Sequence, residues 1–299
     1  MKLWAMLCMA LLVLGGCGGK HVKRVENLYA VKAVEFNRDG VEAMRYERWS
    51  AAERAFSRSL KAAQLADESE MVVHAWYNLA SVRAAQGEQS AEAAYAQAME
   101  LADRYNMPDM KMRARLSLAL WQLGRGQTVQ PVDVSGRWPV DVYLMGGRLA
   151  QKLQDRSAAQ SAYQQAARSA GRDAAGLKMQ AEAHMGLALL ARDAGDVGGI
   201  RVETAKALEL CRQVGAPRLT ANLLLLRASV PEVAAERGDE VERAYSIYEA
   251  LADVEGERQA LQVWIGIAQA GGDTALAESL DAKLKALPAP GDAGKTESE

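Results

Sequence analysis

The sequence has few of the residues that build catalytic or metal centres. Its 299 residues include three cysteines and three histidines, and the histidines (His21, His74 and His184) lie far apart. No group of histidine, cysteine and carboxylate residues has the spacing of a metal site, and no glycine-rich phosphate loop or nucleophile motif is present. We therefore expect no catalytic residue, no metal and no cofactor, and interpret the protein as a non-enzyme. An enzyme with an unrecognised site remains an alternative.

An excess of positive charge is also missing. The chain has 36 basic and 38 acidic residues, whereas binding to phosphate backbones needs a clustered excess of lysine and arginine. This balance argues against nucleic acid as a partner. The short basic segment from Lys20 to Arg24 is a local exception, which either contacts anionic lipid head groups or is a solvated tether.

The only long apolar run lies at the N-terminus, where it extends from Leu3 to Leu14 after Met1 and Lys2. It is too short to span a bilayer. A basic start, a short apolar stretch and small residues before a cleavage point are typical of a secretory signal peptide. We place this signal peptide at residues 1–16.

The end of this run resembles the lipobox of bacterial lipoproteins. The segment from Leu14 to Cys17 has the sequence Leu-Gly-Gly-Cys. The resemblance implies that Cys17 receives lipid and becomes the first mature residue, followed by a tether to residue 32 (residues 17–32). Gly18 in place of aspartate implies sorting to the bacterial outer membrane, with the protein lipid-anchored and facing the periplasm.

The scarcity of cysteine excludes a disulfide framework. Cys8 leaves with the signal peptide and Cys17 is acylated, so Cys211 is the one remaining thiol. An exported protein of this kind depends on packing for its stability. Cys211 lies on an expected amphipathic helix, where we predict a buried structural thiol.

The alternation of apolar and polar residues that is typical of strands is absent, and apolar residues follow helical spacing instead. From Val22 to Leu287 apolar residues recur at intervals of three and four, between breaks rich in glycine, proline and aspartate. We predict an all-α fold of antiparallel helix pairs. Capping boxes, in which a small polar residue precedes Glu or Gln by three positions, are expected at Ser50 with Glu53, Ser157 with Gln160 and Asp239 with Glu242.

The second helices of successive pairs share a triplet of a small residue, an aromatic residue four positions later and, in most, another small residue three further. The triplets are Ala52-Phe56-Ser59, Ala91-Tyr95-Ala98, Ala159-Tyr163-Ala166 and Ala244-Tyr248-Leu251. These spacings place each triplet on one helical face, where alanine allows close approach and the ring fills the adjoining gap.

The first helices carry a leucine and a small residue, with a glycine eight positions after the leucine. The sets are Leu79-Ala80 with Gly87, Leu116-Ser117 with Gly124 and Leu187-Ala188 with Gly195. Together with Trp76 and the second-helix triplets, this order is similar to the tetratricopeptide repeat (TPR), a helix-turn-helix unit of about 34 residues. The resemblance covers residues 33–286 and implies a right-handed α-α superhelical solenoid of TPR-like helix hairpins with a concave face. Slightly longer related helical repeats fit the pattern as well.

One segment interrupts the helical rhythm. Two blocks of TPR-like hairpins, residues 33–124 and 140–287, flank an irregular loop at residues 125–139. Three valines and Trp138 make this loop too apolar for a solvated spacer. It either folds back on the groove, offers an extended segment to a partner, or only links the two blocks. The polar tail at 288–299 is expected to be disordered.

The resemblance to tetratricopeptide proteins also implies a binding face, lined by first-helix residues at fixed offsets from the small position. With Trp138 of the loop added, the candidate partner-binding residues are Asn37, His74, Tyr77, Asn78, Ser81, Lys111, Arg115, Trp138, Arg148 and Gln151. Asn78, Lys111 and Arg115 match part of a set by which some family members hold the C-terminal carboxylate of a peptide. Asn37 and Val41 depart from that set. The other reading of these side chains is a solvated helix face.

These resemblances imply a membrane-tethered adaptor or assembly factor. Its expected partners are protein or peptide segments of a bacterial envelope machine, such as an outer-membrane assembly, pilus, secretion or polysaccharide-export complex. The membrane is contacted through acyl chains on Cys17, which raises the effective concentration of the protein near such partners. A lipid-anchored structural spacer is the alternative, and it would show no apolar patch in the groove.

Overall fold

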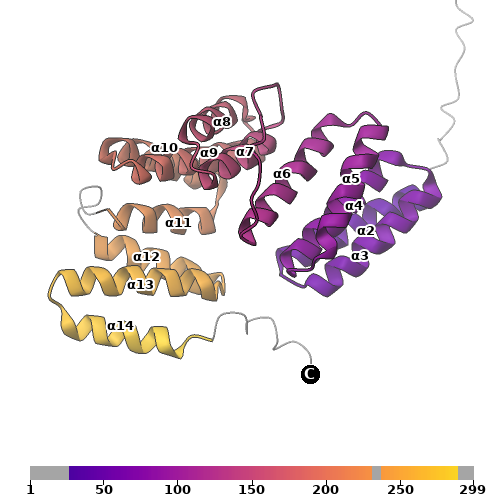
Figure 1. Ribbon diagram of the computed structural model, residues 1–299. Helices are drawn as coiled ribbons and strands as arrows, with labels where there is room; N and C mark the ends of the chain where they lie inside the picture. The colour runs from indigo at the N-terminus through magenta and orange to yellow at the C-terminus, as the bar shows by residue number, and fades with distance from the viewer. Residues whose placement is uncertain (1–26, 231–236, 289–299) are drawn as a thin grey trace, which may run out of the picture.

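The computed structural model describes residues 27–230 and 237–288 (Figure 1). In these two stretches the chain forms 13 α-helices and no strand, so the all-α fold class is confirmed. The helices are α2 (Leu28–Arg45), α3 (Trp49–Ala66), α4 (Ser69–Ala85), α5 (Ser90–Arg104), α6 (Pro108–Gly124), α7 (Val140–Lys152), α8 (Arg156–Ser169), α9 (Ala174–Asp193), α10 (Val197–Val214), α11 (Pro217–Ala228), α12 (Arg237–Ala250), α13 (Val254–Ala270) and α14 (Thr274–Ala286).

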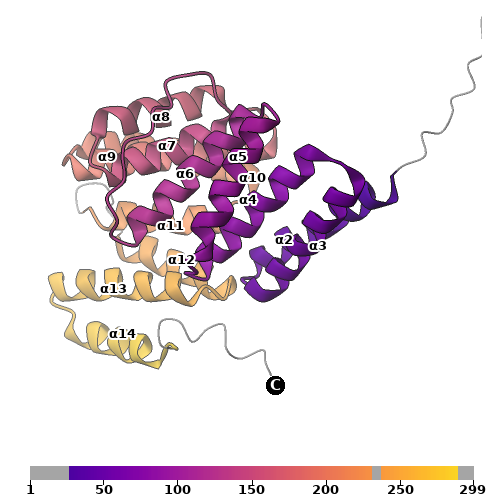
Figure 2. The same ribbon diagram turned by 45° about the vertical axis from the view of Figure 1, so that its right-hand side comes forward.

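Consecutive helices pack against each other along the whole described chain. Helices α2 and α3, α4 and α5, α7 and α8, α9 and α10, α11 and α12, and α13 and α14 form hairpins. The first helix of each hairpin also contacts the first helix of a neighbour, as in α2 with α4, α7 with α9 and α11 with α13. Figures 1 and 2 show the resulting curved row of helices from α2 to α14. This order of contacts is consistent with a solenoid.

A recurrent tight turn sets the start of most helices. In eight turns a residue with positive φ is followed directly by the N-cap residue of the next helix; these residues are Glu47, Asp67, Asn106, Gln154, Gly195, Gly215, Ala252 and Gly272. Residues with a side chain adopt this left-handed conformation rarely. Because five of the eight are not glycine, the glycine pattern alone does not mark these turns.

Aspartate caps five of the described helices. Its side chain accepts a hydrogen bond from the backbone N–H three residues on at Asp155, Asp173, Asp196, Asp253 and Asp273. The capping boxes predicted at Ser50 and Ser157 are wrong. Helix α3 begins at Trp49, so Ser50 lies inside its first turn. Ser157 Oγ donates to Asp155 Oδ1 at 2.9 Å, because the tight turn makes Asp155 the cap. Asp239, the third expected cap, lies within the first turn of α12.

Aromatic rings of the second helices are buried, as the triplets predicted, and two of them fill gaps left by glycines that the triplets do not include. Phe56 is fully buried over Gly40, where an added Cβ would lie 2.5 Å from the ring. Tyr163 lies over Gly147, where an added Cβ would lie 2.7 Å from the ring. Burial of the last triplet is confirmed only in part, since Leu251 is 39% exposed directly after the end of α12.

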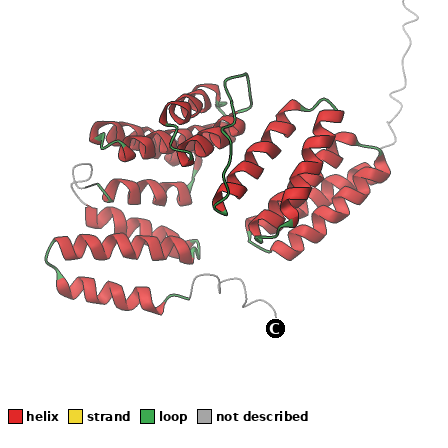
Figure 3. Ribbon diagram, in the orientation of Figure 1, coloured by secondary structure: helices red, strands yellow, loops and turns green. Residues whose placement is uncertain are grey.

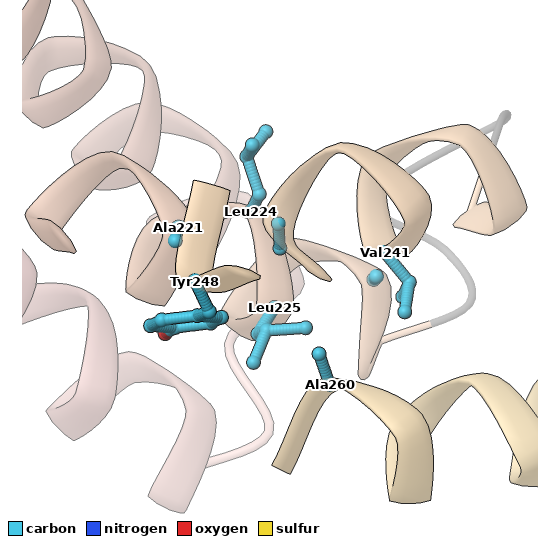
Figure 4. Packing of buried hydrophobic residues seen from close by; sticks show 8 residues of the cluster. Ala221, Leu224, Leu225, Val241, Tyr248 and Ala260 are labelled. Atoms are coloured by element: carbon cyan, nitrogen blue, oxygen red, sulfur yellow. The ribbon is translucent and has the colours of Figure 1, made fainter. Parts of the chain in front are cut away.

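The C-terminal core repeats this packing. Figure 4 shows Tyr248 of α12 beside Ala221 and Leu225 of α11, with Ala260 of α13 nearby. Gly256 lies inside α13, where the absence of a side chain lets the Tyr248 ring pack closely against the helix. A core of alanines and single rings therefore joins successive hairpins.

The irregular loop takes the place of a second helix. Residues 125–139 follow α6, the one first helix of the described chain that has no second helix of its own hairpin, and Figure 3 shows this stretch as loop. Val129, Val132, Val134 and Trp138 pack against buried residues of α6 and α7. An added Cβ on Gly146 would lie 2.7 Å from Val134. The loop therefore contributes to the core and is more than a link between two blocks.

Two further sequence predictions can be compared with the described residues. Helix α2 begins at Leu28, which is inside the range 17–32 predicted as a tether. Cys211 of α10 is 2% exposed, which confirms a buried thiol, and burial raises its pKa. The signal peptide, Cys17 and the tail beyond residue 288 lie outside the described residues.

Candidate partner-binding site

Hydrogen bonds between successive first helices join several candidate residues in the N-terminal half. Asn78 of α4 donates from Nδ2 to Asn37 Oδ1 of α2 at 2.7 Å. Tyr77 Oη, also on α4, lies 3.2 Å from Ser117 Oγ of α6. Ser81 Oγ donates to the carbonyl of Tyr77 at 2.9 Å, one turn earlier on the same helix. These contacts bring Asn37, Tyr77, Asn78 and Ser81 onto one polar face that crosses α2, α4 and α6.

The same arrangement continues in the C-terminal half. Arg148 of α7 donates to Glu182 Oε2 of α9 at 2.9 Å. Gln151 of α7 donates to Asp193 Oδ2 of α9 at 3.3 Å and accepts from Tyr163 Oη at 3.1 Å. Burial raises the pKa of Tyr163 to about 12, so its hydroxyl stays protonated and able to donate. Arg148 and Gln151 therefore link first helices rather than standing free.

The three residues that match a carboxylate-binding set are not joined to one another. Asn78 is bonded to Asn37, and Lys111 Nζ lies 2.5 Å from Asp103 Oδ1 at the end of α5. Arg115 is exposed on α6 and forms no ion pair or hydrogen bond with the described residues. Arg115 is therefore the member of the set with a charge available to a partner.

His74 lies near the start of α4 in a different environment. Its Nε2 atom is 3.8 Å from Glu70 Oε1, and burial lowers the pKa of the imidazole more than this carboxylate raises it. It lines an open pocket of about 570 Å³ together with residues of the α5–α6 turn and of α6. His74 is thus separated by one helical turn from the Asn78 hydrogen bond.

Trp138 has a packing role. It contacts two core clusters, one shared with α6 and α7 and one with α7 to α9. Its backbone N–H donates to Tyr143 Oη at 3.2 Å, while Tyr143 Oη donates to the carbonyl of Gly136 at 2.6 Å. These contacts hold the loop on the helices and leave Trp138 half-buried.

Sequence reasoning missed the ion pair that joins the two halves. Arg113 of α6 donates from Nε and Nη2 to the two carboxylate oxygens of Asp141 on α7, at 2.5 and 3.0 Å. Bidentate pairs of this type fix geometry as well as adding energy. The available signal was a pair of opposite charges near the starts of successive first helices. The candidate residues were chosen by their offsets from the small position, and those offsets do not include Arg113 or Asp141.

Two searches of the described residues bear on other functions. They contain no group of three or more histidine, cysteine or acidic residues that could hold a metal ion. They also contain no helix with the length and apolar character needed to cross a bilayer.

Comparisons with known proteins add a distant likeness. No family model and no curated protein matches the chain. Among solved structures, the chain is similar to the crystal structure of BtubC (BKLC) from P. vanneervenii, with a TM-score of 0.45 and 16% sequence identity. The match covers 87% of this chain and 91% of that one.

Proposed function

We propose that the protein is a membrane-tethered adaptor that binds protein or peptide segments of a bacterial envelope machine. In this proposal its hairpins are TPR-like and form a right-handed superhelix. Lipid on Cys17 anchors the chain to the periplasmic side of the outer membrane. The partner belongs to a complex such as those for outer-membrane assembly, pilus formation, secretion or polysaccharide export.

The observation that carries the proposal is the polar face built across successive first helices. The Asn78–Asn37 and Tyr77–Ser117 hydrogen bonds link three consecutive first helices, and their side chains remain partly exposed. Such a face offers many donors and acceptors at regular intervals, which suits an extended segment of another protein. The repeated distance of 16 residues in Gly40–Phe56 and Gly147–Tyr163 supports a repeating unit.

A pull-down with the full chain from detergent-solubilised bacterial envelopes tests the adaptor function. We expect a specific partner to be retained, and Arg115→Glu to reduce its recovery, since Arg115 is exposed without an ion pair. The combined Lys111→Glu and Arg115→Glu variant should reduce it further. Arg54→Glu is the matched control, because Arg54 is exposed on α3, a second helix. Equal recovery with all variants would show that this face is not the binding surface.

The anchor is tested separately. Mass spectrometry of the mature protein should find an N-terminal Cys17 bearing acyl chains, and Cys17→Ala should abolish acylation and release the protein from the membrane. An uncleaved precursor with an unmodified thiol would contradict the anchoring part of the proposal. The adaptor part would then have to stand on the pull-down alone.

A further inference from the structure

The pocket beside His74 is lined by the start of α4, the α5–α6 turn and the start of α6. Its polar and aromatic lining includes Glu70, His74, Tyr105, Asp109 and Arg113, and its volume is about 570 Å³. It is open to solvent on the same helices that carry the polar face. The pocket therefore has room for a long side chain of another protein together with part of its main chain.

The positive charge in this lining is already neutralised. Arg113 donates to both oxygens of Asp141 and, from Nη1, to Met110 Sδ at 3.3 Å. The hydrogen bond to Asp141 raises the pKa of Arg113, which stays charged and committed to this partner. The guanidinium is thus already paired, and Arg113 with Asp141 adds no net charge.

The two remaining carboxylates have no such partner. Glu70 is nearest to His74, whose pKa is lowered by burial, so the imidazole is neutral at neutral pH. Asp109 lies near enough to raise the pKa of Arg113 but forms no ion pair within the described residues. The pocket therefore has a net negative charge from Glu70 and Asp109.

The remaining walls suit the stem of a long cationic side chain. Tyr105 is 41% exposed and lines the pocket together with His74. Met107 and Met110 provide apolar surface in the same pocket. Lysine and arginine combine an apolar stem with a charged end, and their cations are attracted by aromatic faces as well as by carboxylates.

We propose that this pocket receives a lysine or arginine side chain of the bound partner, with Glu70 and Asp109 facing its charge and Tyr105 lining its stem. The proposal rests on the adaptor function only for the origin of the side chain, since the pocket itself is tested with peptides.

Peptide titration of the full chain in detergent tests the pocket. The probes are acetylated, amidated pentapeptides with a central arginine, lysine, citrulline or glutamate among glycine and alanine. The readout is the NMR signal of His74 in protein labelled at histidine, assigned with His74→Gln. We expect saturable shifts with arginine and lysine, and binding about tenfold weaker or worse with citrulline, which keeps the shape of arginine without its charge.

Two double variants locate the charge that matters. Glu70→Gln with Asp109→Asn should weaken binding of the arginine peptide about tenfold or more. Glu35→Gln with Asp39→Asn removes the same charges from the exposed surface of α2 and should leave affinity within about twofold. Tighter binding of the glutamate peptide, an unchanged affinity in the pocket variant or an equal loss in the control variant would each overturn the proposal.

The two proposals fail separately. If the pull-down retains a partner but the arginine peptide does not bind, the adaptor function stands and the pocket assignment is wrong. If the peptide binds as expected but no partner is ever retained, the pocket assignment stands and the adaptor function is wrong.

Discussion

The packing of Tyr163 predicts opposite effects for one substitution at two glycines. Gly186 of α9 faces the Tyr163 ring, and an added Cβ there would lie 2.6 Å from ring carbons. The ring is 2% exposed and also lies against Gly147. Gly266 of α13 is exposed, and an added Cβ there would meet nothing within 4 Å.

The magnitudes follow from two competing terms. Replacing glycine by alanine within a helix stabilises it by about 1 kcal/mol. Overpacking a well-filled core costs about 1–3 kcal/mol. Gly186→Ala should therefore destabilise the protein by up to about 2 kcal/mol, whereas Gly266→Ala should stabilise it by up to about 1 kcal/mol.

Urea unfolding followed by far-UV circular dichroism measures both variants. Because repeat arrays do not always unfold in a two-state manner, midpoints are compared along with slopes. In a Tyr163→Leu background, Gly186→Ala should lose its cost, since the ring that it meets is gone. Midpoints that move in the same direction for Gly186→Ala and Gly266→Ala would refute the argument from ring packing.

Two other predictions concern single side chains. Tyr143→Phe removes the hydroxyl that holds the loop at Trp138. It should lower the free energy of unfolding by about 1–2 kcal/mol and speed proteolysis within the loop. Unchanged proteolysis would contradict this role of the hydroxyl. Glu257 is buried, and burial followed by two nearby carboxylates raises its pKa. Its ionisation in the folded state is therefore disfavoured, and stability falls as pH rises through that pKa. Glu257→Gln should raise the free energy of unfolding at neutral pH by about 0.5 kcal/mol, because it removes a like-charge contact at i,i+4 with Asp253. This gain should disappear in acid. A gain that persists in acid would show another cause.

The helices and their core were predictable because their signals are local. Spacing of three and four places apolar residues on one face, and a ring such as Phe56 needs a small residue such as Gly40 opposite it. Helix starts were less predictable. Both Asp155 and Ser157 are good caps by residue type, and the choice was made by Gln154, which adopts positive φ although it is not glycine.

The candidate site was predictable as a face but not as a set of contacts. Asn37 and Asn78 do meet across α2 and α4, although Asn37 stands three residues before Gly40 and Asn78 stands two before Ala80. Lys111 instead reaches back to Asp103 of the preceding helix. A long side chain has several carboxylates within reach, and which it selects depends on backbone positions that one sequence does not contain.

The course of the loop at residues 125–139 could not be predicted from local sequence patterns. No helical period predicts its course, because its place is set by separate apolar contacts of Val134, Trp138 and two other valines with α6 and α7. Helix α5, the second helix of the preceding hairpin, has 15 residues and buries six of them. The loop packs against the neighbouring helices with only four partly buried side chains and is held by the Tyr143 hydroxyl. The array therefore continues past a missing helix because side-chain burial, more than helical backbone, holds neighbouring hairpins together.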